Sequence, residues 1–316
     1  MRTRVDLEVR PPTLDDLAEV VELGRAAEIV DCGVAEFTED DLVHEWTELD
    51  LERNAWVVVA DGRIGGYATF EERGGGRLTA DGYVHPELTG RGIGSLLVRL
   101  TEERARKQLA EAVDGQRVYL QNGVLHSNAA ALRLLERCGY RPVRHFFRMV
   151  SDLEEPPAQP VWPEGVRGAP FDPADARAVH AAIEEAFAEE WEHRPETFEE
   201  WEKRKLRDER FDPGLWVVAR DGDEVAGAAV CTWKRMDVGW IDRLGVRPAW
   251  RRRGLGLALL QAAFGEFYRR GERRCGLGVD VQNPTGAIRL YERAGMRVLW
   301  QAVVFEKELR AGRPTR

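Results

Sequence analysis

Hydrophobic and polar positions follow the same order of patterns in the two halves of the chain. Each half begins with a short apolar run and two segments with helical spacing, and two β-branched runs then flank an Asp-Gly pair, which is typical of a β-hairpin. A strand that ends in a glycine-rich loop, a long amphipathic helix, a strand, a short helix and a last strand follow. This order predicts an α/β domain with a mixed sheet flanked by helices.

The predicted elements of the two halves correspond one to one. In the first half we expect strands at 7–10, 56–70 (a hairpin), 79–85, 118–122 and 143–150, and helices at 15–26, 39–49, 92–110 and 128–137. In the second half we expect strands at 166–168, 216–233 (a hairpin), 240–247, 276–281 and 298–307, and helices at 175–188, 197–207, 254–269 and 284–294. Each short helix is followed by a glycine, Gly139 or Gly295, as is common at helix C-termini.

The correspondence extends to the residues themselves, which indicates a duplicated domain. The segment "VHPELTGRGIGSLLV" (84–98) resembles "VRPAWRRRGLGLALL" (246–260), and three other pairs of segments keep the same order. The Pro-rich, acidic stretch 153–164 lacks such a counterpart and predicts a linker. We therefore expect a first copy at 1–152 and a second copy at 165–316, each with a mixed, mostly antiparallel sheet.

Composition narrows the class of protein. The 316 residues are 43% hydrophobic and 32% charged, which is ordinary for a globular chain, and the net charge of −9 argues against a nucleic-acid binder. The four cysteines form no C-x-x-C pair, so we expect reduced thiols in a cytoplasmic protein. We also expect no signal peptide or membrane span. His180 and His193 have no partners at ligand spacing, so no metal site is expected.

The glycine-rich loop of the second copy has the chemistry of an anion site. Arg251, Arg252 and Arg253 precede Gly254 and Gly256, and a helix follows. The N-terminus of a helix presents free backbone N–H groups, and glycine lets a phosphate approach them. The sequence matches neither the Walker motif nor the dinucleotide fingerprint. Taken alone, such a loop is more typical of a tight strand-to-helix turn on a solvated surface.

Two motifs together resemble the GNAT acetyltransferase superfamily. Its signature Gln/Arg-x-x-Gly-x-Gly/Ala, between the fourth strand and the third helix, is matched by residues 251–256. A later motif, Asn-x-x-Ala-x-x-Leu-Tyr-x-x-x-Gly, is matched by "NPTGAIRLYERAG" (283–295) with the asparagine one residue early. We expect Asn283 to cap the helix with Pro284 at its first position. The tandem arrangement resembles the two-domain type represented by the mycothiol synthases.

The resemblance implies where a cofactor would bind. In the superfamily the loop amides hold the pyrophosphate of acetyl-coenzyme A, and the pantetheine arm lies between the splayed fourth and fifth strands. The positions of this chain that match are Leu244, Gly245, Val246, Arg251, Arg252, Arg253, Gly254, Leu255, Gly256 and Asn283, with Gly92 and Gly94 in the first copy. Acetyl-coenzyme A is the expected co-substrate.

The two copies differ where the chemistry would lie. In the first copy Thr89 replaces the leading arginine of the loop, and Leu135 stands where the second copy has Tyr291. A phenol with a pKa near 10 can protonate a leaving thiolate, whereas a leucine cannot. Tyr291 at this place predicts a general acid, and packing in the core is the alternative. We therefore expect the second copy to be catalytic and the first to be a degenerate, mainly structural copy.

Other groups would complete an acyl transfer. A backbone N–H near Gly245 or Val246 would stabilise the oxyanion. Asp242, on the strand before the loop, is the first candidate for the general base, and Glu190 and Asp280 are further candidates. Each of these carboxylates is individually more typical of a surface or structural residue.

Acidic stretches raise the question of the acceptor. Residues 28–52 hold ten carboxylates without Lys or Arg, and residues 184–202 hold nine with one Arg. A cationic amine of a small molecule or peptide would be attracted to such a wall, although acidic runs are usually solvated helix faces. The predicted function is an acetyl-coenzyme A-dependent N-acetyltransferase in a monomer or homodimer. A non-catalytic acyl-coenzyme A sensor, or transfer of another acyl group, is the alternative.

Overall fold

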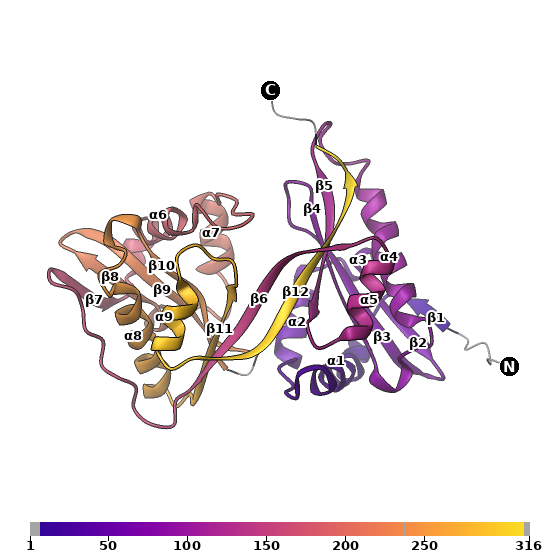
Figure 1. Ribbon diagram of the computed structural model, residues 1–316, viewed down its shortest axis with the longest axis horizontal. Helices are drawn as coiled ribbons and strands as arrows, with labels where there is room; N and C mark the ends of the chain where they lie inside the picture. Colours follow the sequence, from indigo (N-terminus) through magenta and orange to yellow (C-terminus); the bar gives the residue numbers. More distant parts are fainter. Residues whose placement is uncertain (1–6, 237, 313–316) are drawn as a thin grey trace. The chain divides into compact units, whose positions relative to one another are not determined.

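The chain divides into two compact units. The computed structural model describes residues 7–236 and 238–312. One unit comprises Met1–Phe146 with Trp300–Arg316, and the other comprises Phe147–Leu299. Figure 1 shows both units in the colours of the sequence.

The first unit follows the predicted order of elements. It contains β1 (Leu7–Arg10), α1 (Leu17–Cys32), α2 (Glu39–Glu48), α3 (Leu51–Asn54), β2 (Ala55–Ala60), β3 (Arg63–Glu72), β4 (Arg77–Val84), α4 (Ile93–Gln108), β5 (Val118–Leu125) and α5 (Ala129–Arg137). Strands β1 to β4 pair antiparallel in sequence order, and β4 pairs parallel with β5. The short helix α3 was not expected from the sequence.

Alternation along the strands explains how helices cover both faces of this sheet. Val57 and Ile64 belong to an apolar cluster with Val20 of α1, whereas the next residue along β2, Val58, belongs to a cluster with Ile93 of α4. Successive side chains of a strand point to opposite faces, so adjacent valines can serve two cores.

The second unit repeats the order. It contains β7 (Val166–Pro170), α6 (Ala176–Phe187), α7 (Phe198–Lys205), β8 (Val217–Asp221), β9 (Glu224–Arg235), β10 (Val238–Val246), α8 (Leu255–Arg269), β11 (Arg274–Asp280) and α9 (Ala287–Arg293). Strands β7 to β10 pair antiparallel, and β10 pairs parallel with β11. Val179 and Ile183 of α6 and Leu259 and Phe267 of α8 are buried in one core cluster with the strands. The predicted α/β class with a mixed sheet is confirmed.

The last strand of the chain differs from the expectation. We expected 298–307 to complete the second copy, but residues 300–310 of β12 (Arg297–Arg310) lie in the first unit, antiparallel to β5. Figure 1 shows the yellow strand β12 beside β5. Strand β6 (Arg141–Asp152) likewise belongs to the first unit up to Phe146 and to the second unit beyond it. Strand pairing depends on tertiary partners, which a duplicated sequence pattern does not specify.

Two further observations concern the chain as a whole. Residues 153–165, which include the predicted linker, form no helix or strand. Within residues 7–236 and 238–312, no helix is both long and apolar enough to cross a membrane.

Candidate active site

Two neighbouring strands of the second unit separate as they approach the glycine loop. Strands β10 and β11 pair only at Gly239 with Cys275 and at Trp240 with Gly276, within the described residues. Beyond these pairs, β10 continues to Val246 and β11 to Asp280. Backbone pairing between these adjacent parallel strands therefore stops before their carboxyl ends, and this unpaired stretch is called the opening below. The carboxyl ends of parallel strands are where ligands of open α/β sheets are commonly bound.

The loop after β10 presents its backbone to solvent. Gly254 caps α8 with φ of 87°, and a Cβ at this position would meet no atom within 4 Å. Gly256 has a different reason to be glycine, because a Cβ there would lie 3.0 Å from Leu290 Cδ2 of α9. The first glycine supplies the left-handed conformation and an open approach, and the second allows close packing of two helices.

The three loop arginines have different surroundings. Arg251 donates hydrogen bonds to the carbonyl of Val246 (3.1 Å) and to the carbonyl of Ala186 at the end of α6 (2.9 Å). These contacts fix the loop to the helix. Arg252, which has φ of 60°, and Arg253 are exposed and form no ion pair in the described part of the chain. Their guanidinium groups are available to an anion at the loop.

Tyr291, Glu190 and Asn283 form the polar centre next to this opening. Tyr291 is 8% exposed, and burial raises the pKa of its hydroxyl, as does the negative charge of Glu190. The Glu190 carboxylate accepts a hydrogen bond from Asn283 Nδ2 at 3.2 Å. Burial raises the pKa of Glu190, with Asp280 acting in the same direction and Arg243 opposing it. The structure thus brings Tyr291, Glu190 and Asn283 together from three separate segments.

Asp242 has a different set of partners. It is the extra residue of a β-bulge, because Ile241 is opposite Cys231 on β9 and Arg243 is opposite Val230. Its carboxylate accepts a short hydrogen bond from Thr232 Oγ1 and lies 3.5 Å from Lys205 Nζ and 3.4 Å from Arg235 Nη1. Among the described residues, Asp242 has no hydrogen bond to Tyr291 or Glu190. These partners favour a structural role for Asp242.

The predicted cap by Asn283 is wrong. Helix α9 begins at Ala287, and its N-cap is Gly286 with φ of 77°. Asn283 Oδ1 instead accepts hydrogen bonds from the backbone N–H (2.8 Å) and hydroxyl (2.5 Å) of Thr285. The asparagine lies one residue further from the helix than in the motif, so the chain makes a turn before the helix can start.

Two residues near this centre were not singled out as ligands or catalytic groups by the sequence. Arg243 lies with its guanidinium carbon 5.1 Å from the centre of the Phe187 ring. His193 Nε2 is 3.2 Å from Glu184 Oε2. A comparison of the charges on the strands before the two loops would have singled out Arg243, since the corresponding residue of the first copy is acidic. Among the described residues, no three His, Cys, Asp or Glu side chains are grouped to hold a metal ion.

The first copy keeps the geometry of the loop and changes its chemistry. Strands β4 and β5 pair from Arg77 to Ala80, and β4 continues to Val84 beyond the pairing. Gly92 has φ of 90°, and a Cβ at this position would meet no atom within 4 Å. However, Arg91 is already paired with Asp61 at 2.5 Å.

Two positions behind this loop complete the comparison. The side chain of Leu135, at the position of Tyr291, is buried. Asn128 Nδ2 donates to Asp31 at 2.8 Å, which corresponds to the pair of Asn283 with Glu190. Gly94 packs as closely as Gly256, since a Cβ there would be 3.1 Å from Leu134 Cδ2.

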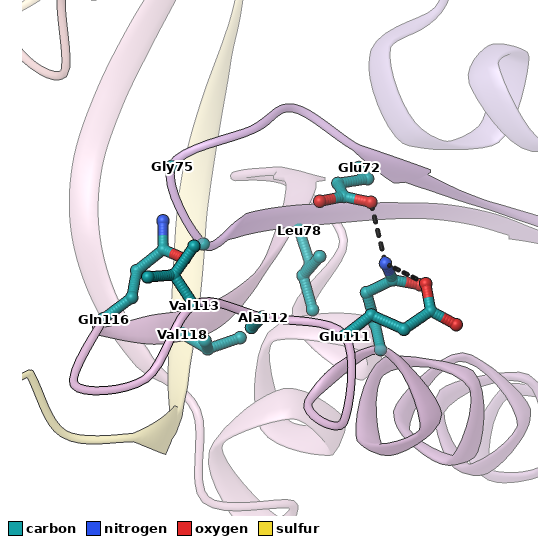
Figure 2. Close-up of a pocket in the computed structure, with 10 residues that line it drawn as sticks. Glu72, Gly75, Leu78, Glu111, Ala112, Val113, Gln116 and Val118 are labelled. Carbon is teal, nitrogen blue, oxygen red and sulfur yellow. Dashed lines mark hydrogen bonds between the residues drawn. The ribbon is translucent and has the colours of Figure 1, made fainter.

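A cavity of about 200 Å³ in the first unit lies elsewhere (Figure 2). It is lined by residues at the starts of β4 and β5 and at the end of α4, among them Gly76, Leu78 and Val118. Gln108 Nε2 bridges two carboxylates at its wall, Glu72 and Glu111. The glycine loop follows the opposite end of β4, so this cavity is not the opening described above.

A family model described as "Acetyltransferase (GNAT) family" matches residues 21–140 and again 177–296. The chain belongs to the GNAT acetyltransferase family. The two matches confirm the tandem arrangement of GNAT domains and the expected acetyltransferase class.

Relatives of this tandem GNAT acetyltransferase include mycothiol acetyltransferases. The protein of Thermobispora bispora is 32% identical over 222 residues, which are 67% of this chain and 70% of that protein. The protein of Geodermatophilus obscurus is 32% identical over 257 residues, which are 77% and 78% of the two chains.

Solved structures have the same tandem fold. The crystal structure of a GCN5-related N-acetyltransferase from Sphaerobacter thermophilus has a TM-score of 0.90 and 39% identity, and covers 98% of each chain. A tandem GNAT protein from the clavulanic acid biosynthesis pathway has a TM-score of 0.74 at 19% identity, and covers 98% of this chain and 100% of its own. The latter is a likeness of fold alone.

Proposed function

We propose that the second copy transfers the acetyl group of acetyl-coenzyme A to a primary amine of a small molecule or peptide. The observation that carries this proposal is the burial of Tyr291 next to Glu190, beside an opening between β10 and β11. The mycothiol acetyltransferases among the relatives support a small-molecule acceptor. Leu135 has no proton to donate, so we propose that the first copy does not catalyse the reaction.

The residues around the loop fit the anionic end of coenzyme A. The open backbone at Gly254, at the N-terminus of α8, would hold the pyrophosphate, and Arg252 and Arg253 would add charge-assisted hydrogen bonds. Arg251 would act indirectly, because its donors fix the loop to Ala186 and Val246. The pantetheine arm would lie between the separated strands near Leu244.

The side chains next to the opening would move the protons of the reaction. The amine nitrogen attacks the thioester carbon, the C–S bond breaks, Glu190 takes the proton of the amine, and Tyr291 donates its proton to the leaving sulfur. Burial keeps Tyr291 protonated at neutral pH, because it raises the pKa of the hydroxyl. Burial also raises the pKa of Glu190 toward the range in which a carboxylate is an effective proton acceptor. A backbone N–H near Gly245 or Val246 would stabilise the oxyanion.

Cofactor binding and thiol release test this proposal together. Isothermal titration should show that acetyl-coenzyme A binds, and release of free thiol should depend on an amine. The double variant Arg252→Ala/Arg253→Ala should bind about tenfold more weakly and with a smaller dependence on salt. Arg91→Ala is the matched control, since Arg91 is paired with Asp61. Absence of binding, or binding without thiol release across a broad panel of amines, would contradict the proposal.

A further inference from the structure

The two copies carry opposite charges at one equivalent position of the strand before the loop. Arg243 on β10 is opposite Val230 of β9, and Asp81 on β4 is opposite Thr69 of β3. Each lies three residues before the valine that ends its strand, Val246 or Val84. Both positions lie beyond the last parallel pair of the separating strands, at the edge of the opening. The duplication therefore provides an internal comparison of what each opening could bind.

Two contacts hold the side chain of Arg243 in place, and its other N–H groups can still donate hydrogen bonds to a ligand. It is exposed, its guanidinium lies over the ring of Phe187 at the end of α6, and one N–H donates to the carbonyl of Asp242 at 3.2 Å. No carboxylate in the described part of the chain forms an ion pair with it. The backbone N–H of Glu190 donates to the carbonyl of Phe187 at 2.9 Å, and Phe187 is the residue whose ring lies under Arg243, so Arg243 and Glu190 share one region.

Most carboxylates of the acidic stretch 184–202 have an ion-pair or hydrogen-bond partner within the second unit. The carboxylates in question and their partners are Glu184 with His193, Glu185 with Arg247, Glu189 with Arg251, Glu196 with Arg204, Glu199 with Arg177, Glu200 with the Thr197 cap and Glu202 with Arg207. The Glu190 carboxylate, in contrast, accepts a hydrogen bond from the Asn283 amide and forms no ion pair in the described part of the chain. The wall is therefore not a general attractor of cations, as the sequence alone suggested.

The first copy has the opposite arrangement. Burial and the negative charges of Asp81 and Glu71 raise the pKa of Glu45 to about 7, while Tyr67 donates a hydrogen bond to it at 3.1 Å. Loss of hydration and the negative charge of Glu71 raise the pKa of Asp81 as well. Glu28 accepts hydrogen bonds from two backbone amides. An anionic ligand would be repelled here and attracted at Arg243.

We infer that the acceptor of the second copy carries an anionic group, a carboxylate or a phosphate, beside the amine that is acetylated. Arg243 binds the anion through a bidentate contact, and Glu190 faces the amine. Arg243 is thus a specificity-determining residue. This inference rests on the proposed function, because it names the class of acceptor for that same site.

Matched acceptors test the inference. One pair is an amino acid and its primary amide, and the other is O-phosphoethanolamine and ethanolamine, so the two arms separate carboxylate from phosphate recognition. The wild-type protein should prefer the anionic member of at least one pair by about tenfold or more in kcat/KM, as a charge-assisted contact allows. Arg243→Gln should abolish this preference through KM, and Arg243→Asp, which installs the residue of the first copy, should reverse it. Arg243→Lys should keep part of it.

Controls separate failure of this inference from failure of the proposed function. Arg269→Gln removes a charge from α8, away from both proposed binding groups, and should leave the preference between paired acceptors unchanged. Equal kcat/KM for both members of each pair, or a preference that survives Arg243→Gln, would overturn the inference while thiol release upheld the proposed function. If no amine supports thiol release, titration of the same pairs onto the coenzyme A complex still decides whether Arg243 binds the anionic members. Equal affinities there would overturn the inference independently.

Discussion

The first and second copies have the same backbone arrangement around the glycine loop but carry different side chains there. Both contain parallel strands that separate, a glycine in the left-handed conformation at the start of a long helix, and a carboxylate bound by an asparagine. The second copy adds Tyr291, two unpaired loop arginines and a bulge at Asp242. The register of β4 against β3 continues without such a bulge. The first copy therefore keeps the fold but lacks the group for proton transfer. Packing requires only side chains of suitable shape, whereas proton transfer requires particular chemical groups.

Electrostatic environment separates the copies as clearly as the tyrosine does. Carboxylates of the second copy are mostly paired with cations, whereas the partners of Glu28, Asp31 and Glu45 in the first copy include backbone amides, Asn128 and Tyr67. Unpaired carboxylates resist ionisation when they are buried, which explains the raised pKa values in the first copy. The acidic stretches 28–52 and 184–202 thus have similar compositions, but their carboxylates have different partners in the folded protein.

The largest effect is expected from removal of the Tyr291 hydroxyl. Tyr291→Phe should lower kcat by roughly 10²- to 10⁴-fold, the usual contribution of a general acid, with little change in affinity for acetyl-coenzyme A. Steady-state kinetics and titration measure the two quantities. Tyr140→Phe, at a buried tyrosine of the first copy, should leave kcat unchanged. Equal losses of turnover and affinity in Tyr291→Phe would instead indicate that the ring only packs.

A smaller effect is expected from the two equivalent carboxylates. Glu190→Gln should lower kcat by about 10- to 100-fold and remove the acidic limb of the pH–rate profile. The sign follows from the direction of the shift: a base acts when ionised, and the pKa of Glu190 is raised, so activity should fall with decreasing pH at values above the ordinary carboxyl range. Asp31→Asn, the counterpart in the first copy, should leave the profile intact. A profile that persists in Glu190→Gln would assign the base elsewhere, with Asp242 and Asp280 next to be tested.

The smallest effect concerns stability. Glu45 has a pKa of about 7 in the folded protein, above its ordinary value of 4.5, so the folded state binds more protons between these values and loses stability as the pH rises through 7. Glu45→Gln should therefore raise Tm at pH 8 by about 2–4 °C and give no gain below pH 4.5. Glu196→Gln should lower Tm at pH 8, since Glu196 is paired with Arg204. Thermal melts at pH 8 and below pH 4.5 measure these changes in Tm. If both variants lost stability at pH 8, the carboxylates of the two copies would not differ as described here.

The elements and the loop could be predicted because their signals are local. Hydrophobic period, Asp-Gly turns and closely spaced glycines act over a few residues, so the positions of β4, β10, α4 and α8 agree with the expected ranges to within a few residues. The cap at Asn283 failed for a local reason as well, since one extra residue before the helix changed a cap into a turn. The partners of Asp242 were not predictable, because Lys205 and Arg235 come from other elements.

The sequence by itself determined the duplication, the order of elements and the presence of Tyr291 in only one copy. Tertiary structure decided which groups meet: Glu190 with Asn283, Arg251 with Ala186, and the end of β12 with β5. The physical reason is the range of the interactions. Helix and turn preferences depend on neighbours along the chain, whereas charge pairing, strand partners and burial depend on residues that only folding brings together.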